Sequence, residues 1–292
     1  TSYVKWVPFS VSFIREMERV LAAEIIFSGC KSRGDLSGFK EHFKVLHTLG
    51  PPEYGTGFLG ELGKEAIGCD SLPSNVEELS FEQCIKLGFE EALCRGLDGF
   101  AGLASALVYA GEQIKRRSGS ISMGFLLAHP RALSRVIRGL VKSKVDHRPL
   151  LPKDLWTVRG IICGGSDATI LKKRVEELWG RLPLEHYASC EGGQLAIQTW
   201  DYEGMTFIPN LNFFEFIPER EYFKWQLDHS YQPQTVLLDE VKAGENYEIV
   251  LTNLHGGAFA RYRIGDIITV SYTHLRAHET VLDIVCRLLL EK

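Results

Sequence analysis

The fold class follows from residues 158–188, which read VRGIICGGSDATILKKRVEELWGRLPLEHYA. The apolar run at 158–163 is typical of a buried strand, and the Gly-Gly-Ser-Asp turn at 164–167 leads from it into a helix. That helix carries apolar residues at helical spacing, namely Leu171, Val175 and Leu178. The chain then returns as a second short strand at 184–188. A strand, a glycine turn, a helix and a strand in this order predict a βαβ unit with a parallel sheet, and therefore an α/β protein.

The segments on either side differ in character. Residues 1–150 are predicted to be mainly helical, because apolar residues recur there at helical spacing, and we expect these stripes in the core. The stripes are Phe13, Ile14, Met17, Val20, Leu21 and Ile25; Phe81, Cys84, Ile85, Gly88, Phe89, Ala92 and Leu93; Phe100, Leu103, Ala104, Leu107, Ala110 and Ile114; and Leu133, Val136, Ile137, Leu140 and Val141. Residues 151–270 continue with strand-like runs at 194–199, 205–208, 213–217, 235–238, 247–251 and 267–270. Their short connections predict a meander or small barrel of antiparallel strands appended to the sheet.

Composition excludes several classes of protein. The net charge of −4 and the pI near 6.2 argue against a nucleic-acid-binding protein. No apolar stretch reaches the ~20 residues that a membrane span requires, and no signal peptide opens the chain. The 7 cysteines include no Cys-x-x-Cys pair, which argues against a zinc site and against a disulfide framework. We expect a cytoplasmic monomer with no nucleic-acid or membrane partner.

Two short motifs carry the functional argument: Tyr187-Ala188-Ser189-Cys190-Glu191 and Arg261-Tyr262-Arg263-Ile264-Gly265-Asp266. Glu191 follows a strand, so we expect it exposed at the carboxyl edge of a sheet, where ligands collect and where a carboxylate can hold Mg²⁺ against phosphate oxygens. Asp266 is the aspartate of a predicted Gly-Asp turn, and its short side chain suits a ribose diol. The plainer interpretations stay open: Glu191 as a loop acid and Asp266 as a turn residue.

The turn at 164–167 is a third candidate. It joins a strand end to a helix start, where backbone amides and the helix dipole favour an anion or a polar ligand edge. The alternative is an ordinary turn in which Asp167 is the N-cap of the helix. His186 and His255 lie near the motifs, but a lone histidine is more often structural. The sequence contains no Gly-x-Ser-x-Gly, His-Glu-x-x-His or complete phosphate-loop signature.

The two motifs, together with Phe207–Asn210, Phe213–Pro218 and the segment from Thr252, resemble the Gretchen Hagen family. These are the auxin-responsive acyl-acid amido synthetases, within the luciferase-like superfamily of acyl-adenylate-forming enzymes. The family's second nucleotide motif is Tyr-Ala-Ser-Ser-Glu, in which Cys190 here replaces a serine. Its third is Tyr-Arg-Val-Gly-Asp, in which Ile264 here replaces the valine. The resemblance covers residues 158–270, and the helical first half only by order and length.

The resemblance implies a site for ATP and Mg²⁺. Adenine would pack near Gly165, Ser166 and Tyr187. Glu191 would be the catalytic residue, beside Mg²⁺ and the phosphates, and Asp266 would bind the ribose hydroxyls. The complete set of implied nucleotide-binding residues is Gly165, Ser166, Tyr187, Ala188, Ser189, Cys190, Arg263 and Asp266. In the implied reaction a carboxylic acid attacks the α-phosphorus of Mg-ATP to give an acyl-adenylate and pyrophosphate, and an amino acid's amine or a thiol then displaces AMP.

The resemblance also implies that residues 1–270 are a partial large domain. The family's phosphate loop would lie just upstream, with Thr1, Ser2, Lys5 and Pro8 as its trailing edge, and a small mobile C-terminal domain would follow Asp266. Residues 271–292 instead resemble translated sequencing-adapter read-through, and we expect them to be a non-native tail. We therefore expect the chain alone to be inactive. The alternative is a non-catalytic member of the same fold that binds a nucleotide or an acyl ligand, since fold does not fix function.

Overall fold

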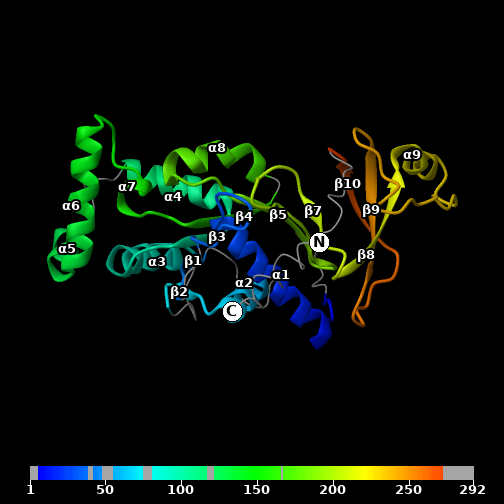
Figure 1. Ribbon diagram of the computed structural model, residues 1–292, viewed down its shortest axis with the longest axis horizontal. Helices are drawn as coiled ribbons and strands as arrows, with labels where there is room; N and C mark the ends of the chain where they lie inside the picture. Colours follow the sequence, from blue (N-terminus) through cyan, green and yellow to red (C-terminus); the bar gives the residue numbers. More distant parts are fainter. Residues whose placement is uncertain are drawn as a thin grey trace. The chain divides into compact units, whose positions relative to one another are not determined.

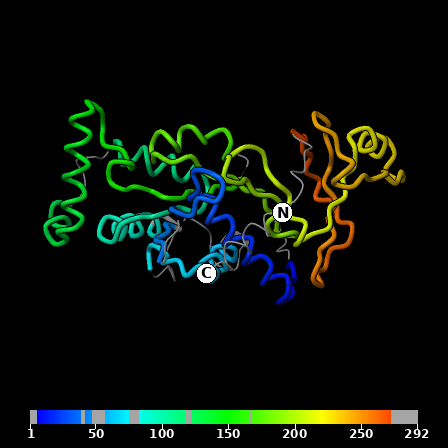
Figure 2. Tube along the Cα trace, viewed as in Figure 1, coloured from blue at the N-terminus to red at the C-terminus, as the bar shows by residue number. Residues whose placement is uncertain are grey.

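The computed structural model describes residues 6–38, 42–47, 55–74, 81–116, 122–165 and 167–271. The chain divides into two compact units (Figures 1 and 2). The first unit comprises Thr1–Val20, Ala188–Ile197 and Gly204–Lys292, and the second comprises Leu21–Tyr187 and Gln198–Glu203. Each unit is considered by itself below.

The second unit contains the predicted parallel sheet. Its strands are β1 (Lys44–His47), β2 (Asp70–Leu72), β3 (Gly99–Leu103), β4 (Gly160–Gly164) and the first residues of β5 (Leu184–Ser189), in the spatial order β2-β1-β3-β4-β5. All four pairings are parallel, and the register sets Phe100 beside Ile161 and Ile162 beside Leu184. The predicted βαβ unit is confirmed as β4, helix α8 (Ala168–Trp179) and β5.

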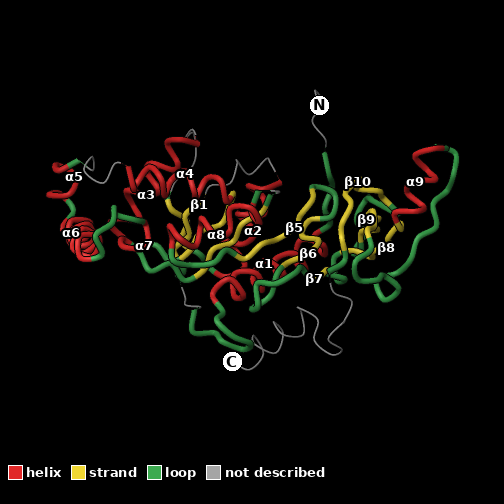
Figure 3. Tube along the Cα trace, turned by 90° about the horizontal axis from the view of Figure 1, so that it is seen from above, coloured by secondary structure: helices red, strands yellow, loops and turns green. Residues whose placement is uncertain are grey.

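Helices surround this sheet, as Figure 3 shows with helices in red and strands in yellow. They are α2 (Gly55–Ile67), α3 (Phe81–Arg95), α4 (Ala104–Arg116), α5 (Met123–Ala128), α6 (Pro130–Val145), α7 (Pro152–Leu155) and α8, and α1 (Val11–Gly29) continues from the first unit into the second. The prediction of a helical first half is confirmed for α1 to α6, but it missed β1, β2 and β3. Phe100 and Leu103, predicted in a helix, lie in β3.

The core of the second unit confirms most of the apolar stripes. Phe89, Trp156 and Trp179 form an aromatic group, with Trp156 and Trp179 stacked at 6.1 Å between ring centroids. Each such pair contributes about 0.5–1.5 kcal/mol beyond its buried area. The prediction was wrong for Leu103 on β3, which is 46% exposed, and for Ile137 and Val141 on α6, which are 51% and 57% exposed. Helix α6 buries only one narrow face, including Ala132, Val136 and Gly139.

The first unit contains an antiparallel meander. Strands β8 (Asn212–Pro218), β9 (Asn246–Asn253) and β10 (Tyr262–Thr269) pair in the order β10-β9-β8, and β6 (Gly193–Ile197) pairs antiparallel with β7 (Thr206–Phe207). Helix α9 (Glu219–Leu227) follows β8. The predicted meander is confirmed. The run at 235–238 is not a strand, and only Val236 forms an isolated bridge, to Phe216.

The two faces of the meander differ because side chains alternate along a strand. One face is apolar: Phe214, Phe216 and Tyr247 are buried there, and Phe216 packs on Phe207 at 5.3 Å and on Tyr247 at 6.2 Å between ring centroids. The other face carries Glu215, Glu248 and Arg263. On β10, Tyr262 lies opposite Leu251 and therefore on the apolar face, whereas Arg263 lies opposite Val250 and on the other face.

Candidate functional site

The turn after β4 contains a glycine in the left-handed region of backbone conformation. Gly165 adopts φ +99°, which a residue with a side chain rarely tolerates, and its carbonyl accepts a 3.2 Å hydrogen bond from the amide of Ala168. Asp167 stands at the N-cap position of α8, but its side chain makes no capping hydrogen bond. Asp167 therefore occupies the N-cap position, as the alternative interpretation predicted, but its side chain does not cap the helix. Ser166 lies outside the described residues.

The second motif forms the end of β5 and the turn that follows it. Tyr187, Ala188 and Ser189 are half-buried, Cys190 is exposed, and Glu191 is half-buried in the turn before β6. The hydroxyl oxygen of Ser189 accepts a 3.0 Å hydrogen bond from the amide of Gly192, which holds the turn closed. Glu191 thus follows the carboxyl end of a strand, as the sequence predicted, but it is half-buried rather than exposed.

One hydrogen bond joins the two motifs within the first unit. The hydroxyl of Tyr262, on β10, donates to Oε1 of Glu191 at 3.1 Å. The side-chain amide of Asn253, on β9, donates to the main-chain oxygen of Glu191 at 3.0 Å. Since Tyr262 and Asn253 come from neighbouring strands, the meander itself orients both the carboxylate and the backbone of the catalytic candidate.

A pair of asparagines completes this support. Asn253 also donates to Oδ1 of Asn212 at 2.9 Å, and Asn212, which is fully buried, donates to the carbonyl of Gly192 at 2.8 Å. Burying an amide is unfavourable unless it is hydrogen-bonded, so this network specifies one arrangement of the turn. Nothing in the sequence pattern marks either asparagine, because their partners are 20 and 62 residues away.

Asp266 lies on a bulge inside β10 rather than in a turn, which corrects the expected Gly-Asp turn. Arg263 pairs with Val250 and Ile267 with Glu248, so three residues of β10 stand opposite Ile249 alone. Gly265 has φ +88° within this bulge. A bulge bends the strand and redirects the side chains around it. Asp266 is exposed there.

Arg263 has a different environment from Tyr262, its neighbour in the strand. Its guanidinium pairs with the buried Glu248, with Nε to Oε1 at 2.9 Å, and lies 3.9 Å from the ring centroid of Trp225 on α9. Tyr262 and Arg263 are adjacent in β10, so they point to opposite faces of the sheet. The structure therefore does not bring Arg263 together with Glu191.

The two histidines near the motifs have partners. His255 is exposed, and its Nε2 lies 2.8 Å from the carbonyl of Asn210, which supports a structural role. His186, on β5, forms an ion pair through Nδ1 with the buried carboxylate of Glu24 on α1. Burial opposes the charged imidazole, but the charge and hydrogen bond of Glu24 outweigh it, so the pKa of His186 is raised.

The candidate residues fall in both units. Gly165 and Tyr187 belong to the second, whereas Ala188, Ser189, Cys190, Glu191, Arg263 and Asp266 belong to the first. Within the described ranges, no three His, Cys, Asp or Glu side chains gather closely enough to hold a metal ion by themselves. Among the helices that the structure describes, none is both long and apolar enough to cross a membrane.

Comparison with known proteins confirms the resemblance. Residues 205–287 match the GH3 family central domain, and this match extends into the segment 271–292. Jasmonoyl–L-amino acid synthetase JAR4 of Nicotiana attenuata is 37% identical over 136 residues, which are 44% of this chain and 22% of the relative. 4-substituted benzoates-glutamate ligase GH3.12 of Arabidopsis thaliana is 41% identical over 66 residues, which are 23% of this chain and 10% of the relative.

Solved structures agree with the fold. AtGH3.15 acyl acid amido synthetase, solved with 2,4-DB, has a TM-score of 0.58 at 18% identity, over 94% of this chain and 52% of that one. A 2-hydroxyisobutyryl-CoA ligase has a TM-score of 0.53 at 13% identity, over 88% of this chain and 47% of that one. The chain therefore shares the fold of these two solved ligases, and it spans about half of their length.

Proposed function

We propose that the protein containing this chain is an ATP-dependent ligase that activates a carboxylic acid as an acyl-adenylate and then joins it to an amino acid. The relatives named above are a jasmonoyl–L-amino acid synthetase and a 4-substituted benzoates-glutamate ligase, which favours an amine acceptor over a thiol. The observation that carries the proposal is the Tyr262–Glu191 hydrogen bond, because it unites the two nucleotide motifs.

The residues present fit Mg²⁺ delivered by the nucleotide. Mg²⁺ keeps much of its water shell and is usually held by one or two carboxylates together with substrate phosphates. A single carboxylate such as Glu191 is sufficient for that arrangement, and Tyr262 and Asn253 hold it in place. When bound, Mg²⁺ would neutralise charge on the phosphates during transfer.

The remaining roles rest on the family resemblance. It assigns Gly165 and Tyr187, in the second unit, to the adenine, and Asp266, in the first unit, to the ribose hydroxyls. A substrate carboxylate oxygen then bonds to the α-phosphorus while the bond to the β-phosphate oxygen breaks. In the second step the amine nitrogen bonds to the acyl carbon, AMP leaves, and the amine loses a proton.

The adenylation step is tested by exchange of labelled pyrophosphate into ATP. The test uses the full-length protein that contains this chain and a panel of aryl, indolyl, cyclic and fatty acids. We expect exchange that depends on one class of carboxylic acid, because adenylation is reversible while the acyl-adenylate stays bound. A panel that gives no exchange, with AMP binding intact, would favour the non-catalytic binding protein.

The chain alone provides a second arm of the test. Because it spans about half of the solved ligases, we expect no adenylation above background, but weak binding of AMP through Gly165, Tyr187 and Asp266. The described cysteines are free thiols, which supports a reducing compartment such as the cytosol.

A further inference from the structure

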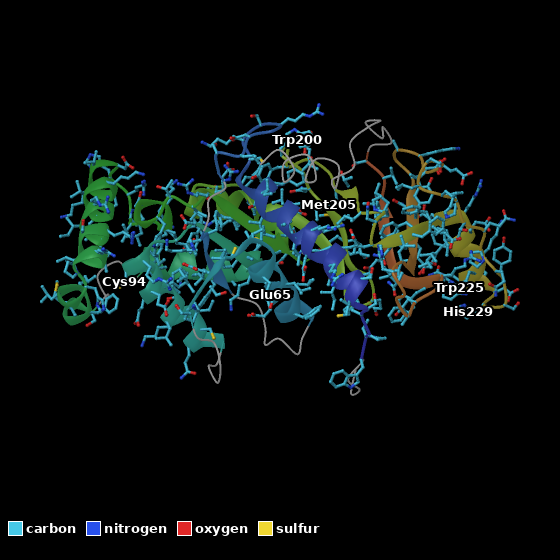
Figure 4. The ribbon with its side chains drawn as sticks, turned by 60° about the horizontal axis from the view of Figure 1, so that its bottom comes forward. Glu65, Cys94, Trp200, Met205, Trp225 and His229 are labelled. Atoms are coloured by element: carbon cyan, nitrogen blue, oxygen red, sulfur yellow. The ribbon has the colours of Figure 1, made fainter. Side chains whose placement is uncertain are left out.

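Four arginines line a cavity in the second unit, at the junction of two helices. Arg95 closes α3, and Arg131, Arg135 and Arg138 lie one or two turns apart along α6. The cavity has a volume of about 350 Å³, and Cys94, Pro130 and Ser134 complete its lining. Figure 4 labels Cys94 near the end of α3, in the region where this helix contacts α6. No part of the candidate nucleotide site lines this cavity.

The positive charge of the cavity is only partly compensated. Arg95 forms ion pairs with Asp70 at 3.2 Å and Glu91 at 3.3 Å. Among the residues that the structure describes, no carboxylate pairs with Arg131, Arg135 or Arg138, and the lining contains no Asp or Glu. The carboxylate of Glu90 acts electrostatically on the thiol of Cys94 but is not part of the lining.

Arg135 is fixed by the end of α3. Its guanidinium donates to the carbonyls of Leu93 at 2.6 Å and Ala92 at 3.3 Å, which belong to the last turn of α3. Burial, and then the like charge of Arg138, lower the pKa of Arg135. Arg135 is thus a cationic side chain held in place on one side of the cavity, while Arg131 and Arg138 are exposed.

The start of α6 adds to the positive potential. Its N-cap, His129, makes no side-chain capping hydrogen bond, and the first turn contains no acidic residue. Pro130 and Arg131, in this first turn, line the cavity. The partial positive charge of a helix N-terminus is therefore added to that of the arginines, with no carboxylate of the first turn to offset it.

We propose that this cavity, which we call the arginine cavity, binds a small phosphate-bearing anion. Guanidinium groups match the geometry of phosphate and carboxylate oxygens in paired hydrogen bonds. A tetrahedral phosphate offers acceptor oxygens in several directions, as arginines arriving from two helices require, whereas a carboxylate offers two oxygens in one plane. The volume of about 350 Å³ leaves room for a phosphorylated small molecule as well as for phosphate alone.

The test uses inorganic pyrophosphate as the probe and the double variant Arg131→Gln/Arg138→Gln. Both side chains are exposed, so their replacement should preserve folding, whereas Arg135 is left intact because it caps α3. The control is Lys144→Gln/Lys173→Gln, which changes the net charge equally at exposed positions of α6 and α8 outside the cavity. By calorimetry we expect pyrophosphate binding to weaken at least about tenfold in the arginine variant only.

Cys94 reports whether the probe occupies this cavity. Cys84, also half-buried on α3 but outside the lining, is a matched control, and burial raises the pKa of both thiols. Peptide mapping after alkylation should show that pyrophosphate slows modification of Cys94 relative to Cys84, and that the arginine variant abolishes this protection.

Three results would overturn the proposal. These are unchanged alkylation of Cys94 with pyrophosphate present, equal pyrophosphate affinity in the arginine variant and in the unmodified chain, and protection by citrate without protection by pyrophosphate. Because none of these readouts involves adenylation, the proposal stands or falls separately from the ligase activity.

Discussion

At the scale of single residues, Asp266 and Glu191 lie in different environments, so we expect their substitution to have different effects. Asp266 lies exposed on the β10 bulge, so replacing it by asparagine keeps the shape and removes only the charge. We expect Asp266→Asn to weaken AMP binding by about 1.5–3 kcal/mol, because hydrogen bonds to a charged acceptor are lost. Calorimetry on this chain measures it, with Asp239→Asn, an exposed aspartate of the same unit, as the control. Unchanged affinity would mean that Asp266 is a structural bulge residue.

Glu191 should act on turnover rather than on nucleotide binding. In the full-length protein we expect Glu191→Gln to lower the rate of pyrophosphate exchange and to raise the Mg²⁺ concentration required, because a neutral amide holds Mg²⁺ poorly. Tyr262→Phe removes the 3.1 Å hydrogen bond but leaves the carboxylate, so its effect should be smaller, about 0.5–1.5 kcal/mol in activation free energy. If both variants lose the same activity, the main role of Glu191 is to hold the turn.

At the scale of secondary-structure elements, alternation along β10 decides the role of Arg263. The guanidinium compensates Glu248, whose side chain is only 2% exposed. Arg263→Leu leaves a buried carboxylate unpaired, so we expect it to lower the free energy of unfolding by about 3 kcal/mol. Arg261→Gln is the control: its arginine is 66% exposed and paired with Glu215, so we expect less than about 1 kcal/mol. Chemical denaturation measures both. A stable Arg263→Leu chain with lost AMP binding would instead restore Arg263 to the nucleotide site.

The contact between α1 and β5 should make stability depend on pH through His186. Since Glu24 raises the pKa of His186 in the folded chain, the pair stabilises the fold fully below the unfolded histidine pKa of about 6.5. That contribution is lost as the pH rises through the raised folded pKa. We expect the melting temperature to fall over this interval, and the corresponding step to disappear in Glu24→Gln. A step of equal size in both chains would assign the pH dependence to other groups.

The sequence predicted elements best where the pattern and the surroundings agreed. The β4–α8–β5 unit was found because an apolar strand, a glycine turn and a helical stripe follow one another. Strand β3 was missed because it runs directly into α4, so that Phe100, Leu103, Ala104 and Leu107 happen to fit one helical stripe. Periodicity alone cannot separate a short buried strand from a helical turn.

At the scale of the whole molecule, long-range partners explain what the sequence could not provide. The motifs could be predicted from the sequence, since Glu191 and Asp266 lie in recognisable short patterns. The hydrogen-bond partners around them could not be predicted, because Asn212, Asn253 and the Glu24–His186 pair depend on contacts between residues far apart in the chain. The bulge at Asp266 likewise results from the register of β10 against β9.

The segment 271–292 gives the last prediction, because two observations about it conflict. Its sequence resembles adapter read-through, while the GH3 family match continues to residue 287. This segment lies outside the described residues except for Ser271. If it is a non-native tail, removing residues 272–292 should change the free energy of unfolding by no more than about 0.5 kcal/mol, the usual scale for changes away from packed features. Denaturant titration of the shortened and the complete chain, with AMP binding as a second readout, makes the comparison. A loss of several kcal/mol, or a shortened chain that does not fold, would show that the segment is part of the native domain, as the family match indicates.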